Sequence, residues 1–240
     1  MNHLILVRHG QSVWNLEKRF TGWVDVELTV QGKLEANKSG ELIKKLNLKI
    51  NNFFCSYQKR AINTLDLIVN TINSKPNQIT KAWELNERHY GELTGLNKDQ
   101  MKKVYGEKKI HIFRRSWDMS PAPLNKNNPY HPLNIEIYKN IPRDKIPDTE
   151  SLKDTYERVI YYYLKNIEPL IQNGQNVLIS AHGNTLRALC KKLFNISDKN
   201  ISRLEIPTGN PLLIKFKNNL KINGCRYLDS SRSKDLLVKF

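Results

Sequence analysis

Two short and nearly continuous apolar segments, "LILV" at residues 4–7 and "VLISA" at residues 177–181, constrain the fold more than any other feature. A strand that is apolar at successive positions is buried on both faces, as in a parallel sheet covered by helices on either side. Between such segments the chain carries apolar residues at helical spacing. The alternation predicts an α/β fold, a three-layer sandwich in which a largely parallel central sheet is flanked by helices on both faces.

The individual elements follow from the same patterns. We expect strands over 3–8, 52–55, 79–82, 176–181 and 212–216, and helices over 30–46, 60–73, 151–171 and 184–194. Thr29 is a candidate N-cap for the helix over 30–46. Ser151 and Asp154 resemble a capping box that opens the helix over 151–171.

A length of 240 residues suits one domain. Six of the ten prolines fall between residues 116 and 149, which predicts an irregular insertion that acts as a lid or binding loop. The last residues, about 229–240, form a polar segment that we expect to be a tail. We therefore predict a single domain over 1–240 with this insertion and this tail.

The net charge of +16 is compatible with several kinds of partner. Nucleic-acid binding would need basic residues gathered on one face, and membrane-surface binding would need a basic amphipathic helix. An enzyme for a polyanionic substrate would need arginines that converge on a pocket. Much of the charge is lysine, which we interpret mainly as a solvated surface coat. We therefore expect a small anionic substrate, with neither nucleic acid nor membrane as a partner.

The cellular context follows from the cysteines and the N-terminus. The three widely spaced cysteines show neither a disulfide framework nor a metal-ligand pattern. No apolar run approaches the roughly 20 residues that span a bilayer. The N-terminal apolar stretch is too short for a secretory signal. We expect a cytoplasmic protein.

Both apolar segments end in a histidine followed by a glycine, His9-Gly10 and His182-Gly183. The carboxyl ends of parallel strands meet at one edge of the sheet, where ligands bind. Glycine allows a sharp turn and a close approach of the backbone. A single histidine in such a place is more often a core residue, but two in matching contexts favour a functional site.

Several kinds of site lack their residues in this sequence. Zinc would need three or four ligands at suitable spacing, and a serine hydrolase would need a Gly-Xaa-Ser-Xaa-Gly motif. A phosphate-binding Gly-rich loop with Lys-Ser or Lys-Thr is also missing. Arg8 lies beside His9, and Arg60 opens the helix after the second strand. Because arginine forks match phosphate oxygens, this arrangement favours a histidine that accepts a phosphoryl group.

A set of longer motifs supports this interpretation. Together "LVRHGQSVWN", "RFTGW", "KRAINT", "ELNERHYGELTGLNK", "FRR" and "AHGN" resemble the cofactor-dependent phosphoglycerate mutases of the histidine phosphatase superfamily. "RHG" marks the whole superfamily, whereas "NERHYGELTGLNK" is far more specific. The resemblance extends from about residue 4 to about residue 228, and it weakens in the proline-rich insertion and in the tail.

The resemblance implies the activity and the site residues. It implies interconversion of 3-phosphoglycerate and 2-phosphoglycerate through a phosphohistidine, primed by 2,3-bisphosphoglycerate and without a metal. His9 is the implied nucleophile, and Glu87 is the implied acid and base for the substrate hydroxyl. The residues implied around the phosphoryl group are Arg8, Arg60, His182, Asn184, Asn15, Thr21 and Gly22. Ser12 and Gly183 are implied as substrate-binding residues. Those implied for the rest of the substrate are Tyr90, Lys98, Arg114 and Arg115. Relatives are commonly dimers or tetramers, so the resemblance also implies a homo-oligomer.

Each of these residues also has a plainer interpretation. Glu87 could form a surface salt bridge with Arg88, the pair Arg114-Arg115 could be solvated, and Tyr90 could be core. Ser12 is the small hydroxyl typical of the mutases, whereas glycine there is associated with relatives that favour bisphosphoglycerate synthesis.

Two other functions remain open. One is a phosphatase of the same superfamily, which would admit water to the phosphohistidine where a mutase excludes it. The other is a nucleic-acid-binding protein, which the charge alone suggests.

Overall fold

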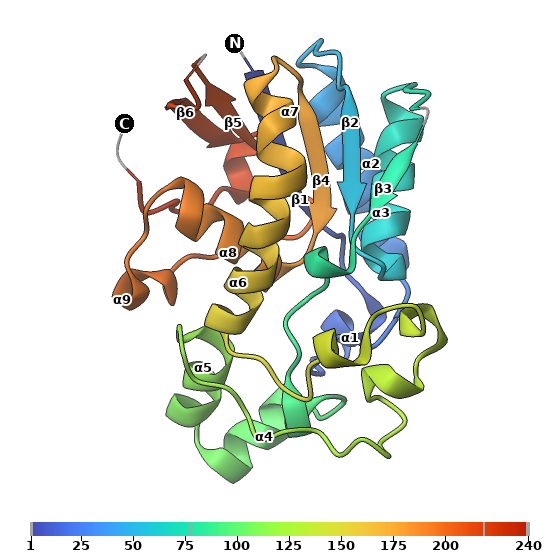
Figure 1. Ribbon diagram of the computed structural model, residues 1–240, viewed down its shortest axis with the longest axis vertical. Coiled ribbons are helices and arrows are strands. Elements are labelled where there is room, and N and C mark those ends of the chain that lie inside the picture. The colour runs from blue at the N-terminus through green and yellow to red at the C-terminus, as the bar shows by residue number, and fades with distance from the viewer. Residues whose placement is uncertain (1, 77, 218, 239–240) are drawn as a thin grey trace.

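A computed structural model describes residues 2–76, 78–217 and 219–238. Its centre is a six-stranded sheet with the strand order β3-β2-β4-β1-β5-β6 (Figure 1). The strands are β1 (Asn2–Arg8), β2 (Asn52–Cys55), β3 (Ile79–Lys81), β4 (Val177–Ala181), β5 (Leu212–Phe216) and β6 (Ile222–Tyr227). All five predicted strands are present within one or two residues of their expected ends, and β6 was not predicted.

Strand direction divides the sheet into two parts. β3, β2, β4 and β1 are parallel to one another, whereas β5 runs antiparallel to β1 and β6 antiparallel to β5. The prediction of an α/β fold with a largely parallel sheet is confirmed, with an antiparallel hairpin at one edge. The carboxyl ends of β1 and β4 meet because Arg8 pairs with Ala181.

Helices cover both faces of the sheet. The α-helices are α1 (Val13–Leu16), α2 (Val30–Lys44), α3 (Lys59–Thr71), α4 (Lys98–Tyr105), α5 (Glu107–Arg115), α6 (Leu152–Tyr162), α7 (Glu168–Gln172), α8 (Gly183–Leu193) and α9 (Asp198–Ile201). Short 3-10 helices occupy Trp83–Leu85, Gly91–Leu93, Pro132–Asn134, Glu136–Tyr138, Arg143–Lys145 and Ser230–Arg232. In the described ranges, no helix is both long enough and apolar enough to cross a membrane.

The apolar strands bury alternate side chains in two cores. Leu4 and Leu6 of β1 join the core beneath α6, α7 and α8, whereas Ile5 and Val7 join the core beneath α2 and α3. Figure 1 shows α6 and α7 crossing the front of the sheet, with α2 and α3 behind it. Two-sided burial is therefore why these strands are apolar at successive positions.

The predicted helix over 151–171 is interrupted. Ser151 and Asp154 form the expected capping box, and α6 runs to Tyr162. A π-helical turn then spans Tyr163–Ile167, and Pro169 lies in the first turn of α7. Because proline lacks a backbone N–H, the regular hydrogen-bond ladder cannot continue through this point.

The proline-rich segment 116–149 is less irregular than expected, since three of the short 3-10 helices lie in it. Its buried Tyr138 donates a hydrogen bond to the carbonyl oxygen of Trp23 at 2.5 Å. The ring of His131 lies 3.0 Å from the carboxylate of Asp148, which joins the middle of the segment to its C-terminal end. The contact of Tyr138 fixes the segment against the loop that contains residues 20–24.

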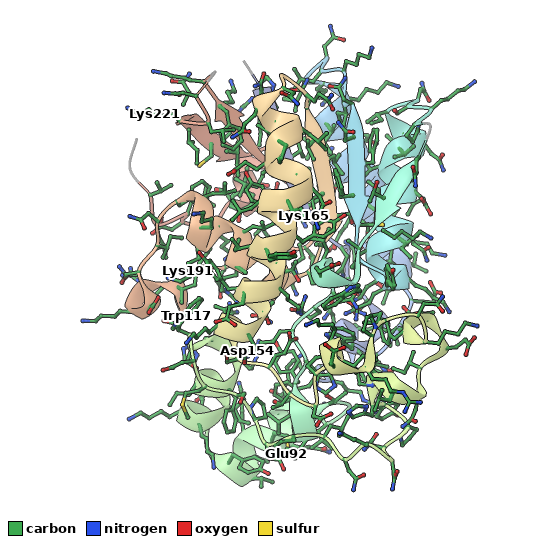
Figure 2. The ribbon with its side chains drawn as sticks, viewed as in Figure 1. Glu92, Trp117, Asp154, Lys165, Lys191 and Lys221 are labelled. Carbon is green, nitrogen blue, oxygen red and sulfur yellow. The ribbon has the colours of Figure 1, made fainter. Side chains whose placement is uncertain are left out.

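Two further contacts attach segments that follow the helices. Trp117, just after α5, lies beneath the ammonium group of Lys191 of α8, 4.5 Å from the ring centre (Figure 2). In the C-terminal segment, Arg232 donates to the carbonyl oxygens of Thr208 and Gly209. The predicted tail over 229–240 is thus described to residue 238, and its last two residues lie outside the described part.

The turn after β1 touches helix α2 without an intervening side chain. A Cβ atom added to Gly10 would lie 2.1 Å from the carbonyl oxygen of Gly32, and one added to Gly32 would lie 2.0 Å from that of Gln11. The side chain of Thr29, the predicted N-cap of α2, accepts from the Gly32 N–H, and the backbone N–H of Thr29 donates to the carbonyl oxygen of Gln11 at 2.9 Å. Close backbone packing therefore fixes the turn that follows His9.

We expect Gly32→Ala to lower the free energy of unfolding, although alanine favours helix by up to about 1 kcal/mol over glycine. The added methyl group meets backbone, which cannot rotate away, so we expect a net loss of about 1–3 kcal/mol. Urea unfolding of the variant and of Lys33→Ala, an exposed position in the same helix, measures the difference. Equal stability of the two variants would contradict the close contact.

Candidate functional site

The two predicted histidines lie together at the carboxyl ends of β1 and β4. The ring centres of His9 and His182 are 5.0 Å apart, and both side chains are buried. The backbone N–H of His9 donates to the carbonyl oxygen of Ala181, which joins the ends of the two strands. In Figure 1 the arrowheads of β2 and β4 point to the same end of the molecule, where α1, α4 and α5 lie.

The hydrogen bond of His9 determines which ring nitrogen is free to react. Its Nδ1 atom lies 2.7 Å from the carbonyl oxygen of Gly10. Because a carbonyl oxygen only accepts, Nδ1 carries the proton and Nε2 keeps its lone pair. Burial lowers the pKa of His9 well below 6.5, and the positive charges of Arg60 and Arg8 lower it further. The imidazole is therefore neutral and nucleophilic at Nε2.

His182 makes its hydrogen bond through the other ring nitrogen, Nε2, and its partner is Ser56. The Nε2 atom of His182 lies 2.7 Å from the hydroxyl oxygen of Ser56, which also accepts from the backbone N–H of Gln58. Burial, followed by the charge of Arg60, lowers the pKa of His182 well below 6.5, so the ring is neutral and carries one proton. In the tautomer in which the Ser56 hydroxyl donates to Nε2, that proton is on Nδ1, which is buried and has no partner within the described ranges.

The two arginines predicted beside the histidines are held by backbone oxygens. Arg60 donates to the carbonyl oxygens of Gly22 and Val24, each at 2.9 Å, and Arg8 donates to that of Ile206 at 2.8 Å. The Nε atom of Arg8 is buried and lacks a partner in the part of the chain that the structure describes. Burial lowers the pKa of both guanidinium groups, but arginine is not deprotonated in proteins, and no carboxylate among the described residues forms a salt bridge with either.

A small cavity of about 90 Å³ is lined by Arg8 and Gly183, the sequence neighbours of His9 and His182, whereas the two histidines and Arg60 are not part of its lining. Seven of the predicted site residues line it together with one that was not predicted: Arg8, Glu87, Tyr90, Arg114, Arg115, Gly183, Asn184 and Arg187. Four of the eight are arginines, and Glu87 is the one carboxylate among them. Such a lining suits a ligand with several negative charges.

Glu87 is buried rather than exposed on the surface. Its Oε1 atom accepts from the backbone N–H groups of Arg88 at 2.8 Å and Asn184 at 3.2 Å. The guanidinium of Arg88 instead donates to the carbonyl oxygen of Phe113 and lies over the ring of Tyr90. The alternative of a surface salt bridge between Glu87 and Arg88 is therefore wrong.

Two residues that were not predicted position the backbone of Glu87. The side chain of Gln58 accepts from the Glu87 N–H at 3.0 Å and donates to Gly22 at 2.9 Å. Arg158 donates to the Glu87 carbonyl oxygen at 3.0 Å while it pairs with the carboxylate of Glu150. The sequence carries no local signal for either contact, because the partners are distant along the chain.

The charged groups around Tyr90 change its acidity. Burial raises the pKa of the Tyr90 phenol, but the positive charges of Arg88, Arg114 and Lys98 outweigh this, so the pKa is lowered. Lys98 donates to the carbonyl oxygen of Arg19 at 2.6 Å, and burial lowers its pKa to about 8.

The remaining predicted residues lie outside the lining of the cavity. Ser12 and Asn15 cap α1 reciprocally, and the Asn15 side chain accepts from the Ser12 N–H at 3.2 Å. Thr21 is buried in the loop before Trp23, and Gly22 adopts a φ of 53°, which favours glycine. Gly22 contributes through its carbonyl oxygen, which accepts from Arg60 and Gln58.

Arg187 is the cavity residue that sequence reasoning missed. It lies three residues after Asn184, so both side chains share one face of α8. That spacing was the available signal. No cluster of three His, Cys, Asp or Glu side chains suited to a metal occurs in residues 2–76, 78–217 and 219–238.

The sequence of this chain matches a known family along most of its length. The family described as the histidine phosphatase superfamily (branch 1) matches residues 4–129 and 126–221. A protein of Pelagibacter ubique (strain HTCC1062) is 64% identical over 238 residues, which cover 99% of this chain and 100% of that protein. A protein of Maricaulis maris (strain MCS10) is 45% identical and covers 98% of each chain. Both are named 2,3-bisphosphoglycerate-dependent phosphoglycerate mutase.

Solved structures share the fold at lower identity. The mycobacterial glucosyl-3-phosphoglycerate phosphatase, solved with VO3, superposes with a TM-score of 0.68 at 20% identity and covers 95% of this chain and 97% of its own. Bacillus stearothermophilus YhfR gives the same TM-score and identity over 93% of this chain and 95% of its own. The chain thus belongs to the histidine phosphatase superfamily and, within it, to the 2,3-bisphosphoglycerate-dependent phosphoglycerate mutase family that its sequence motifs predicted.

Proposed function

We propose that this chain interconverts 3-phosphoglycerate and 2-phosphoglycerate through a phosphohistidine at His9, as a 2,3-bisphosphoglycerate-dependent mutase. One observation carries the proposal. The neutral His9 presents a free Nε2 atom beside a second buried histidine, and its sequence neighbour Arg8 is one of four arginines that line a cavity. The relatives that share up to 64% identity with this chain carry the name of this activity.

The groups around His9 suit the transfer of a phosphoryl group. The lone pair of Nε2 attacks phosphorus while the bond from phosphorus to the substrate oxygen breaks. Arg8 and Arg60 supply positive charge, and together with the Nδ1–H of His182 they supply hydrogen bonds to the three equatorial oxygens, where negative charge is spread in such transfers. The partnerless Nδ1 of His182 and Nε of Arg8 are consistent with this role, because buried donors are costly unless something accepts from them.

We propose that Glu87 moves the proton of the substrate hydroxyl. It gives a proton to the oxygen that leaves phosphorus and takes one from the hydroxyl that attacks the phosphohistidine in the reverse step. Two backbone N–H groups hold its Oε1 atom, so the carboxyl has a fixed direction at the cavity wall.

The remaining cationic groups suit the other end of the substrate. Tyr90, Arg114 and Arg115 line the cavity, and Lys98 is close enough to them to affect the acidity of Tyr90. They would hold the carboxylate and the second phosphate. Asn15, Thr21 and Gly22 would complete the phosphoryl end, and Ser12 would also contact the substrate, as the resemblance implies.

The same residues fit the primer, 2,3-bisphosphoglycerate, whose two phosphates and carboxylate need many donors. When bound, this group supplies the phosphoryl group that loads the enzyme. Arg8 and His182 each offer a buried donor without a partner among the described residues, and the other arginines of the cavity offer further positive charge. We propose no metal for the reaction.

A mutase differs from a phosphatase of the same superfamily in excluding water from the phosphohistidine. We propose that the segment 116–149 acts as a lid with this purpose. Its contacts with Trp23 place it against the loop that also holds Arg60 through Gly22. We further propose that the enzyme acts in the cytoplasm as a homo-oligomer on a small anionic substrate, without nucleic-acid or membrane partners.

We expect turnover of 3-phosphoglycerate to depend on priming and to survive a chelator. An enolase-coupled assay with and without 2,3-bisphosphoglycerate and with a metal chelator measures this. Inorganic phosphate released per 2-phosphoglycerate formed is the second readout, and we expect it to be small. Phosphate release as the main outcome would make the protein a phosphatase, and activity that manganese restores after chelation would contradict the mechanism.

We expect Glu87→Gln to slow both loading of His9 and turnover by roughly 10²–10⁴-fold, the usual contribution of a general acid or base. The amide keeps the shape of the side chain but cannot exchange the proton. KM should change little because the arginines hold the substrate. Steady-state kinetics and acid-labile, base-stable phosphate measure the two steps. Glu92→Gln, at an exposed position labelled in Figure 2, is the control. If Glu87→Gln left both rates unchanged, the acid–base role would belong to another residue.

We expect the stability of the protein to fall as the pH falls below 6.5. Burial lowers the pKa of His9 and His182 well below 6.5 and that of His89 to about 3, so the unfolded chain binds protons that the folded chain does not. The contribution to the free energy of unfolding is complete above pH 6.5, and it is lost as the pH falls toward the lower pKa of each histidine in the folded state. Each histidine contributes a slope of at most about 1.4 kcal/mol per pH unit.

Urea unfolding between pH 5 and pH 7 measures this slope. His89→Asn, in which the amide oxygen can still accept from the Gly91 N–H, should reduce the slope by about one proton. His111→Asn, at an exposed position, should leave it unchanged. A slope that His89→Asn does not alter would show that this ring titrates normally.

A further inference from the structure

Arg187 is a buried arginine at the cavity wall to which the resemblance gives no role. Its side chain is 5% exposed, and its Nε atom donates to the carbonyl oxygen of Leu204 at 2.9 Å. Its Nη1 atom donates to Oδ1 of Asn184. In the part of the chain that the structure describes, no carboxylate forms a salt bridge with it.

The contact with Asn184 sets the direction of a chain of hydrogen bonds. A guanidinium can only donate, so the oxygen of the Asn184 carboxamide must face Arg187 and the NH2 group must face the other way. That NH2 group lies 3.0 Å from the hydroxyl oxygen of Tyr90. The tyrosine oxygen therefore accepts, and its own proton is free to be donated elsewhere.

The position of Tyr90 in the site determines which group can accept its free hydroxyl proton. Tyr90 lines the same cavity as Arg114, Arg115 and Arg187, where an anionic ligand would meet the cationic groups. If the carboxamide turned over, its oxygen would take the tyrosine proton. The phenol would then offer a lone pair to the ligand, which repels an anion.

We propose that Arg187 is a positioning residue, which fixes the direction of the chain from Arg187 through Asn184 to Tyr90 so that the tyrosine donates its proton to the anionic substrate. The inference rests on the proposed function, since it takes 3-phosphoglycerate as the ligand. The backbone N–H of Asn184 also holds Glu87 at 3.2 Å. Asn184 thus contacts both Tyr90, the group that would bind the substrate, and Glu87, the group that would carry the proton.

A double-mutant cycle tests whether Arg187 acts through Tyr90. Arg187→Met and Tyr90→Phe are made singly and together, and the Kd of 3-phosphoglycerate is measured by calorimetry alongside KM and kcat. We expect each single variant to weaken binding by about 10- to 100-fold, the range for a hydrogen bond to a charged group. The double variant should bind about as weakly as the weaker single variant. Effects that multiply would overturn the proposal, because they would mean that Arg187 acts on the substrate independently of Tyr90.

Conservative variants separate positioning from a merely structural role. Lysine also only donates, so Arg187→Lys should stay within a few-fold of the wild type in Kd and KM. Glutamine can donate or accept, so Arg187→Gln should resemble Arg187→Met. Equal Kd values for the Lys and Gln variants would overturn the proposal, even if Arg187→Met does not fold. Arg203→Met, at an exposed position close to Leu204, controls for the loss of one positive charge.

The two proposals fail in different ways. Calorimetry needs no turnover, so a wild-type protein that binds 3-phosphoglycerate without primed turnover would refute the mutase function and leave the cycle informative. A wild-type protein with primed turnover and multiplicative effects in the cycle would refute the role of Arg187 alone.

Discussion

The site depends on positive charge that is buried but not neutralised. Carbonyl dipoles satisfy the N–H groups of an arginine and leave its net charge in place, whereas a carboxylate would cancel it. Arg158 is the contrast, since it pairs with the buried carboxylate of Glu150 and does not line the cavity. The arginines held mainly by backbone oxygens are Arg8 on Ile206, Arg60 on Gly22 and Val24, Arg88 on Phe113, and Arg187 on Leu204.

These same bonds organise loops that are distant along the chain. The carbonyl oxygens belong to the loop after α1, to α5 and to the segment between α9 and β5. The hydrogen bonds hold these segments near the carboxyl end of the sheet. A bound anion would relieve the repulsion among the guanidinium groups that hold those loops. Ligand binding and the order of the loops are therefore expected to stabilise each other, by mass action on the folded state.

Much of this arrangement could be predicted from the sequence. The two strands that end in His-Gly placed His9 and His182 together because strand direction and burial are local properties of the chain. The capping box at Ser151 was equally local. The motifs of the family then indicated Glu87 and Tyr90, which now line one cavity.

The parts that were missed depend on contacts between distant segments. β6 has the mixed pattern "INGCRY", which became a strand because β5 offers a free edge. Ser56 and Gln58 act through partners more than 25 residues away, so no spacing reveals them. The prolines of 116–149 suggested irregularity, but the buried Tyr138 gives the segment an anchor that is visible only in three dimensions.

The contact between Gly10 and Gly32 bears on how such a site can change during evolution. Because the backbone at Gly10 touches the backbone at Gly32, substitution of a side chain cannot change this contact in small steps. The half of the site that carries the nucleophile is therefore expected to tolerate few substitutions. The opposite half is different. The α4–α5 pair rests on a small separate core around Phe20 and Phe113, and it carries Lys98, Arg114 and Arg115. New substrates would therefore arise through exchange of that pair, while the strand ends and α2 stay as they are.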